Sequence, residues 1–251
     1  MSEKQAKAAD NSAPVPFLFQ QPELLTLEEH AALGIAPQPG PYNFAAEARA
    51  VPLTLPELAA AQKDYPVVFT NMETPYLVAV LGVLEDRNLF VQDGLWEEGR
   101  YVPAYLRCYP FIFAGEQNGR IAVALDRAAA CVSDKPQQPF FVDGKLTQRT
   151  EELMRFCAQY EAERRRTAEF CTVLKDMGLL CPQQSSFTRA GSDKQESLAN
   201  YVSIDSEKLA QLDDDSVLKL HRSGRLAAAY LQLYSLENWQ SLVERRAALL
   251  S

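Results

Sequence analysis

Apolar runs of four to eight residues, separated by short polar turns, occupy the middle of the chain and predict a series of β-strands. Asp-Gly or Asn-Gly pairs at 93–94, 118–119 and 143–144 can adopt the left-handed backbone that tight hairpins require. Hairpin connections favour antiparallel pairing, because parallel strands need crossovers of a dozen or more residues. The expected strands cover residues 67–70, 76–83, 88–92, 111–114, 120–126 and 139–142, and most of 42–55.

Beyond Thr147 the apolar residues recur at three- and four-residue steps, which is typical of an amphipathic helix. We expect one long helix over residues 147–178, which Gly178 ends and Pro182 prevents from continuing. Two short helices are expected earlier in the chain. Each begins at a threonine, Thr26 or Thr54, that is followed three residues later by a glutamate in the manner of a capping box.

The last quarter of the chain begins with a polar stretch, residues 183–200, which we expect to be a loop with a partly helical segment near Gln195. A strand follows at 201–204, and Asp205 and Asp213 are suited to cap two short helices. The Ala- and Leu-rich stretch 225–250 predicts one helix, or two helices joined near Ser235.

These elements indicate an α+β fold with a largely antiparallel β-sheet core over about residues 42–143, a long amphipathic helix and a helical C-terminal part. We divide the chain into a disordered tail (residues 1–16), an α+β core (17–182) and a small C-terminal subdomain (183–251) of one strand and several helices packed on the core.

The charge balance adds a constraint on partners. The net charge is −8 and the isoelectric point is about 5.0, whereas nucleic-acid-binding proteins rely on basic patches. The main basic run, Arg164–Arg166, is surrounded by glutamates, and pairs such as Glu161–Arg165 are expected to lie along one helical face. We therefore expect no nucleic-acid partner.

The cysteines and the N-terminal segment indicate where the protein resides. Five cysteines with no Cys-x-x-Cys pair fit a reducing compartment. The first sixteen residues lack the apolar core of a signal peptide, and no apolar run approaches the ~20 residues of a membrane span. We interpret the protein as cytoplasmic, with no membrane span.

Motifs of catalysis and of cofactor binding are missing from the sequence. It contains no glycine-rich phosphate loop, no Gly-x-Ser-x-Gly and no His-Glu-x-x-His, and it has two histidines, His30 and His221. The acidic run Asp213–Asp215 lacks the spacing of a calcium loop and is better explained as a helix start. We expect no cofactor, no metal and no catalytic residue that a motif identifies.

One segment, residues 88–126, has an unusual density of aromatic and arginine side chains. An arginine between aromatic rings can stack while it offers a planar fork to a carboxylate, as recognition of a peptide or a small acid requires. In a helical turn, three tyrosines at four-residue spacing would share one face. The alternative is that these side chains fasten an irregular crossover to the sheet. The candidate ligand- or partner-binding residues are Trp96, Arg100, Tyr101, Tyr105, Arg107 and Tyr109, together with His30 on the first short helix.

Three stretches of the chain resemble the SapC family, a bacterial group named for S-layer association. They are YPVVFTN (Tyr65–Asn71), the stretch Leu81–Phe111, and GRLAAAYLQLYSLENWQSL (Gly224–Leu242). The agreement extends over roughly residues 17–243. The resemblance implies a connection with surface layers, and it supplies no catalytic residue or cofactor that could be transferred to this chain.

Two hypotheses about function follow. The first is a cytoplasmic binding or accessory protein that engages a protein or an exported peptide, and whose apolar C-terminal helices belong to the core or to a homodimer surface. The second is an enzyme, or an enzyme subunit, that acts on a peptide or amino-acid-like substrate at a pocket spanning Trp96–Tyr109. Arg107 would then hold a carboxylate while a tyrosine or Glu97 moved protons. We favour the first.

Overall fold

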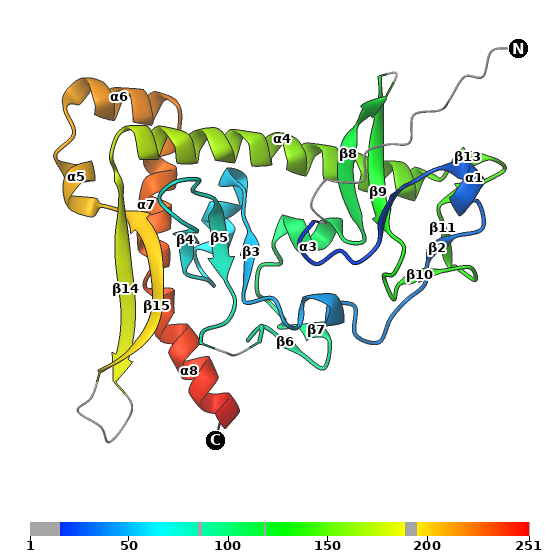
Figure 1. The fold of residues 1–251 in the computed structure, drawn as a ribbon, viewed down its shortest axis with the longest axis horizontal. Coiled ribbons are helices and arrows are strands. Elements are labelled where there is room, and N and C mark those ends of the chain that lie inside the picture. Colours follow the sequence, from blue (N-terminus) through cyan, green and yellow to red (C-terminus); the bar gives the residue numbers. More distant parts are fainter. Residues whose placement is uncertain (1–15, 85–86, 118, 189–194, 251) are drawn as a thin grey trace, which may run out of the picture.

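The computed structural model describes residues 16–84, 87–117, 119–188 and 195–250. One long helix, α4 (Gln148–Asp176), runs along most of the length of the molecule and connects two β-rich regions (Figure 1). Thr147 caps it by accepting a hydrogen bond from the Thr150 amide at 3.3 Å. The long helix predicted from the apolar spacing is thereby confirmed.

A five-stranded antiparallel sheet forms the first β-rich region, with the strand order β14-β15-β4-β5-β3. Residues far apart in the sequence meet in it, because β15 from the last quarter of the chain pairs with β4 at Val202 and Phe69. The strands are β3 (Ala50–Pro52), β4 (Val67–Phe69), β5 (Leu77–Val80), β14 (Leu180–Thr188) and β15 (Gln195–Ile204).

The second β-rich region consists of hairpins and short pairs, all of them antiparallel. Two of its turns use the predicted Asp-Gly pairs, since Asp93, Gly94, Asp143 and Gly144 all have positive φ. Asn118 lies outside the described residues. The pairs are β1 (Pro22–Leu24) with β9 (Arg120–Asp126), β9 with β8 (Phe111–Gln117), β2 (Gly34–Ile35) with β10 (Val132–Ser133) and β11 (Gln138–Pro139), β6 (Val91–Gln92) with β7 (Leu95–Trp96), and β12 (Phe141–Val142) with β13 (Lys145–Leu146).

Short helices connect these strands, and four helices complete the C-terminal part. The predicted caps are present: Asp205 and Asp213 accept hydrogen bonds from amides of the helices that follow them, and Thr26 accepts one from the Glu29 amide. The helices are α1 (Leu27–His30), η1 (Asn43–Ala45), η2 (Leu55–Glu57), α2 (Leu58–Ala61), α3 (Ala104–Cys108), α5 (Ser206–Ala210), α6 (Asp214–Arg222), α7 (Arg225–Ser235) and α8 (Asn238–Leu250).

Helix α7 attaches to the five-stranded sheet through buried polar side chains. Gln232 is fully buried, and its amide donates to the Val67 carbonyl at 2.8 Å and accepts from the Ile204 amide at 3.3 Å. Ser235 accepts from the Val67 amide at 2.9 Å. Gln232 and Ser235 thus satisfy backbone groups beside the position where β15 and β4 meet, and an unsatisfied buried amide or carbonyl would be costly.

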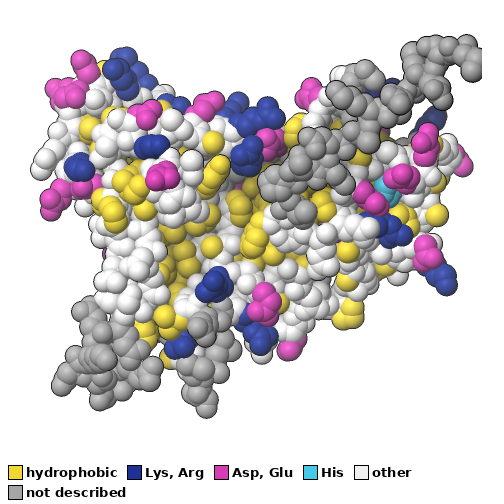
Figure 2. Space-filling model, in the orientation of Figure 1, with side chains coloured by type: hydrophobic (Ala, Val, Ile, Leu, Met, Phe, Trp, Pro, Cys, Tyr) yellow, Lys and Arg dark blue, Asp and Glu magenta, His cyan; other side chains and the backbone are white. Residues whose placement is uncertain are grey.

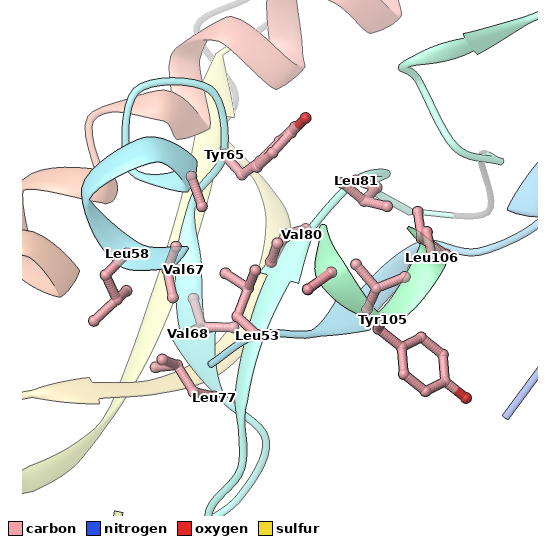
Figure 3. Packing of buried hydrophobic residues seen from close by; sticks show 14 of the residues in the cluster. Leu53, Leu58, Tyr65, Val67, Val68, Leu77, Val80, Leu81, Tyr105 and Leu106 are labelled. Carbon is pink, nitrogen blue, oxygen red and sulfur yellow. The ribbon is translucent and has the colours of Figure 1, made fainter. Parts of the chain in front are cut away.

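A continuous hydrophobic core links the sheet, α4 and the short helices. Side chains from β4, β5, α2 and α3 converge on one another in Figure 3, which labels Leu58, Tyr65, Val68, Leu77 and Leu106 among others. Phe69 of β4 and Phe170 of α4 lie 6.5 Å apart between ring centroids, so the core extends from the sheet to α4.

The α+β class and the antiparallel arrangement are confirmed, but several local predictions are wrong. The strand expected at 88–92 covers only Val91–Gln92. The polar stretch 183–200 is a long hairpin of β14 and β15 rather than a loop, as far as the described residues show it. Residues 42–55 contain η1 and the short strand β3 rather than a continuous strand. Among the described residues, no helix combines the length and apolar character needed to cross a membrane.

Candidate functional site

The turn of the β6–β7 hairpin packs against residues 40–43, at the start of the aromatic and arginine segment. The turn requires glycine at position 94, because a Cβ atom on Gly94 would come within 2.4 Å of the Asn43 amide oxygen. Gly94 also accepts a hydrogen bond from the Tyr42 amide at 2.9 Å. The chain then crosses to α3 through residues 97–103. We call the side chains of this stretch the crossover cluster: Trp96, Glu97, Arg100, Tyr101, Tyr105, Arg107 and Tyr109.

Glu57, which the sequence predicted as a capping-box residue but not as a site residue, organises one end of the crossover cluster. As expected from the capping box, one carboxylate oxygen accepts from the Thr54 amide at 2.9 Å and from the Thr54 hydroxyl at 2.8 Å. The other oxygen accepts from the Ala104 amide at 2.6 Å and the Tyr101 hydroxyl at 3.0 Å. Glu57 is 5% exposed, so this carboxylate ties η2 to the start of α3 inside the protein.

Arg107 lies between two aromatic rings, one from the crossover and one from α4. Its guanidinium carbon is 5.6 Å from the Tyr101 ring centroid and 5.1 Å from that of Phe156 on α4. One guanidinium nitrogen donates to the Tyr101 hydroxyl at 3.1 Å. Burial and the Glu57 carboxylate raise the pKa of Tyr101 to about 12. Tyr101 is therefore a neutral hydroxyl at physiological pH and a poor general base.

Trp96 packs within an aromatic group beside the crossover. Its ring lies 5.5 Å from Tyr42 and 6.3 Å from Phe90, and Phe90 in turn contacts Tyr65 at 4.7 Å. Tyr65 is fully buried, its hydroxyl donates to the Tyr101 carbonyl, and burial raises its pKa far above the usual range. These rings hold the crossover backbone in place.

Glu97 and Arg100 form an ionic group at the protein surface. Arg100 donates to Glu97 and to Asp64, both at 3.0 Å, and Asp64 accepts from the Tyr101 amide at 2.9 Å. Arg245 of α8 also donates to Glu97, and its guanidinium stacks 4.3 Å from the Phe90 ring. Hydrogen bonds from Arg245 lower the pKa of Glu97, which therefore stays ionised at neutral pH.

Tyr105 and Tyr109 point toward the N-terminal segment, away from Tyr101. The Tyr105 hydroxyl donates to the Phe17 carbonyl, and the Tyr109 hydroxyl donates to Asp126 at 3.0 Å. Asp126 is fully buried and also accepts from the backbone amide of Gln21 at 2.8 Å. The three tyrosines do not share one face, because each reaches an acceptor on a different segment. Burial raises the pKa of both Tyr105 and Tyr109.

His30 lies on α1, in the second β-rich region and apart from the crossover cluster (Figure 1). It is fully buried, and its Nε2 atom is 3.0 Å from a carboxylate oxygen of Glu23. Its Nδ1 atom lies 3.2 Å from the Thr26 amide nitrogen and 3.1 Å from the Thr26 carbonyl oxygen. His30 thus holds the start of its own helix against β1.

Three surface hollows formed by the described residues lie away from the crossover cluster. One lies between α4 and the start of α7, a second between the β14–β15 hairpin and α8, and a third beside β1, β9 and the β12–β13 hairpin. Residues of the crossover cluster line none of these three hollows. Within the described residues, no three His, Cys, Asp or Glu side chains are grouped to hold a metal ion.

Comparison with known proteins gives one match. A family model described as SapC matches residues 25–242, which is most of the chain. No curated protein and no solved structure matches it. The matched range contains the crossover cluster, Glu57, Asp64, Asp126 and α7. Arg245, which binds Glu97, lies three residues beyond it.

Proposed function

The chain belongs to the SapC family, and from this premise we propose that it is a binding or accessory protein in surface-layer or exported-peptide handling. The observation that carries this proposal is that the tyrosine and glutamate side chains of the crossover cluster bind partners within the protein. The hydroxyls of Tyr65, Tyr101, Tyr105 and Tyr109 all donate to internal acceptors. Such a network stabilises a fold, whereas acid–base catalysis needs a titratable group within reach of a substrate.

The pKa shifts agree with a structural role. Burial raises the pKa of Tyr101 to about 12, while Arg245 and Arg100 hold Glu97 in its ionised form. Neither side chain therefore exchanges protons readily near neutral pH. Arg107 is exposed, and its guanidinium contacts Tyr101 and Phe156.

One observation favours the enzyme hypothesis. The Tyr101 hydroxyl donates to the Glu57 carboxylate and accepts from Arg107. An enzyme that binds a substrate carboxylate could use the arginine to hold the substrate, and the glutamate and tyrosine to move protons. The buried position of Glu57 weighs against it, because the carboxylate oxygens already accept four hydrogen bonds inside the protein.

We further propose that the protein acts in the cytoplasm. All five cysteines are free thiols, and burial raises the pKa of Cys171 to about 12, which keeps that thiol protonated and unreactive. Free thiols persist in a reducing compartment. Fractionation of the native bacterium should recover the protein with a cytoplasmic marker enzyme, and recovery with a periplasmic marker would contradict this proposal.

A single assay separates the two hypotheses on function. Fluorescently labelled peptides from the surface-layer protein of the same bacterium, with scrambled peptides of equal composition as controls, are mixed with the purified full chain. Anisotropy reports binding, and mass spectrometry reports any cleavage or transfer. We expect saturable binding of native-sequence peptides with no chemical change. Turnover that disappears in Tyr101→Phe would support the enzyme hypothesis and contradict ours.

A further inference from the structure

The hollow between α4 and α7 combines positive charge with apolar surface. Its volume is about 520 Å³, within the ~300–1,000 Å³ that small-molecule sites occupy. Ala168 and Val173 of α4 contribute apolar surface, and the stems of the arginines add to it. We call it the arginine hollow, after Arg164, Arg165 and Arg225, which line it together with Ala168, Glu169 and Val173.

Hydrogen bonds arrange two of these arginines without using all their donors. Glu161 accepts from Nε and Nη2 of Arg164 at 2.6 and 2.9 Å, and from Nε of Arg165 at 2.8 Å. The helical pairing expected for this run is thereby confirmed. Among the hydrogen bonds of the described residues, the Nη atoms of Arg165 remain available to an external acceptor. One carboxylate thus holds two guanidinium groups in place.

Arg225 brings a third positive charge from a different element. Its nearest carboxylate oxygen, on Glu169, is 4.0 Å away, which is longer than a hydrogen bond, and Glu169 is 70% exposed. Three guanidinium groups therefore face two carboxylates, Glu161 and Glu169, on a protein whose net charge is −8. Figure 2 shows Lys and Arg atoms gathered over the middle of α4. This local excess of positive charge complements a negatively charged ligand.

The start of α7 adds to this positive potential. Helix α7 has eleven residues and begins at Arg225, and its N-cap is Gly224, which has no side chain to bind the first amides. The amino end of a helix carries a partial positive charge, so an anion near Arg225 is stabilised by the helix as well as by the guanidinium group. The positive charge of the three arginines does not vary with pH, because arginine stays protonated throughout the physiological pH range.

We propose that the arginine hollow binds a carboxylate group that is attached to an apolar body, such as the C-terminal residue of a peptide. Arginine offers paired donors that match a carboxylate, and the apolar wall favours a ligand that carries more than the charge. The inference rests on the proposed function for the identity of the ligand as a peptide. The arginine hollow itself can be tested without that assumption, by using a small probe.

The probe is N-acetyl-leucine, with N-acetyl-leucinamide and inorganic phosphate as comparisons, measured by isothermal titration calorimetry on the full chain. We expect the carboxylate probe to bind more tightly than the amide or phosphate, and to weaken as salt is added. Arg225→Gln should weaken its binding by about fivefold, as expected for a partly exposed ion pair. Arg166→Gln is the matched control, because Arg166 lies on the same helix, pairs with Glu163 and does not line the hollow.

The outcomes distinguish a failure of the inference about the arginine hollow from a failure of the proposed function. Equal binding of the amide, tighter binding of phosphate, or equal effects of Arg225→Gln and Arg166→Gln would overturn the inference about the hollow. If surface-layer peptides bind and Arg225→Gln does not weaken them, the proposed function survives and the inference fails. If the small carboxylate binds through Arg225 while no peptide binds, the inference stands and the proposed function fails.

Discussion

The crossover cluster and the arginine hollow both set arginine side chains against apolar surface, yet they use their polar atoms differently. In the crossover cluster, the Tyr101 hydroxyl donates to the buried Glu57 and accepts from Arg107, so these groups are paired within the protein. In the arginine hollow, Arg165 and Arg225 line a space that is open to solvent. The comparison shows that a high density of arginine and aromatic residues does not by itself identify a binding site. The two regions differ in that the arginines of the arginine hollow line a hollow in the protein surface.

The largest effect should follow from removing Glu57. Glu57→Ala leaves the buried Ala104 and Thr54 amides without their acceptor, and each such loss costs ~1–3 kcal/mol. We expect the free energy of unfolding in urea to fall by about 3 kcal/mol or more. Glu98→Ala, an exposed glutamate on the neighbouring loop, is the control and should change stability by less than about 0.5 kcal/mol. Similar losses in the two variants would refute the structural role of Glu57.

Tyr109→Phe should have the next largest effect. It removes the hydroxyl that donates to the fully buried Asp126 and leaves the ring, which stacks on Phe44 at 3.9 Å. Loss of one donor to a buried carboxylate should cost about 1–2 kcal/mol. Calorimetry would show this as a lower melting temperature. An unchanged melting temperature would contradict a stabilising role for the Tyr109 hydroxyl.

Glu97 should contribute less, and its contribution should depend on pH. Because the pKa of Glu97 is lowered in the folded protein, ionised Glu97 stabilises the fold above its unfolded pKa. This contribution disappears as the pH falls through the folded value. Glu97 is over a third exposed, so we expect Glu97→Gln to cost less than about 1 kcal/mol at pH 7. Urea unfolding at pH 7 and at pH 3 tests this, and an equal difference at both pH values would contradict it.

The smallest effect on stability is expected in the arginine hollow. Arg225→Gln should change the free energy of unfolding by less than about 0.5 kcal/mol, because its ion pair with Glu169 is long and exposed. Urea unfolding provides the measurement, with wild type unfolded in parallel. A loss as large as that of Tyr109→Phe would make Arg225 a structural residue and remove the contrast between the two regions.

Much of the fold could be predicted because its signals are local. The Asp-Gly turns at residues 93–94 and 143–144, the caps at Asp205 and Asp213, and the apolar spacing of α4 are each fixed by neighbouring residues in the sequence. Short-range hydrogen bonds and periodicity favour such elements whatever the distant contacts are.

The β14–β15 hairpin could not be predicted in the same way. Its strands carry polar residues on positions that face solvent, so the alternation that reveals a half-buried strand is weak. Polar pairs hold it together instead: Gln184 donates to both Ser197 and Asn200 on the opposite strand, at 3.1 Å each. A polar strand of this kind can be told from a loop only when its partner strand is known.

The grouping of aromatic and arginine residues in one segment is visible in the sequence, but their contacts are not. The sequence placed Arg107 among aromatic rings, and the structure does so through Tyr101 and Phe156. No local pattern could show that Glu57 would accept hydrogen bonds from the crossover, or that Arg245 would reach Glu97, because these contacts join segments 44 to 148 residues apart. Contacts with residues distant in the sequence determine whether a polar side chain is hydrogen-bonded within the protein or can bind a ligand.

The central claim is that the crossover cluster has a structural role. Hydrogen exchange of the Ala104 amide tests it most directly, because this amide donates to Glu57, which also accepts from Tyr101 of the cluster. If the cluster is an interlocked part of the core, the amide should exchange only when the whole protein unfolds. Its protection should then lie within about 1 kcal/mol of the global free energy of unfolding. Exchange through a low-energy local opening would show that the crossover moves independently, and would contradict a structural role for the crossover cluster.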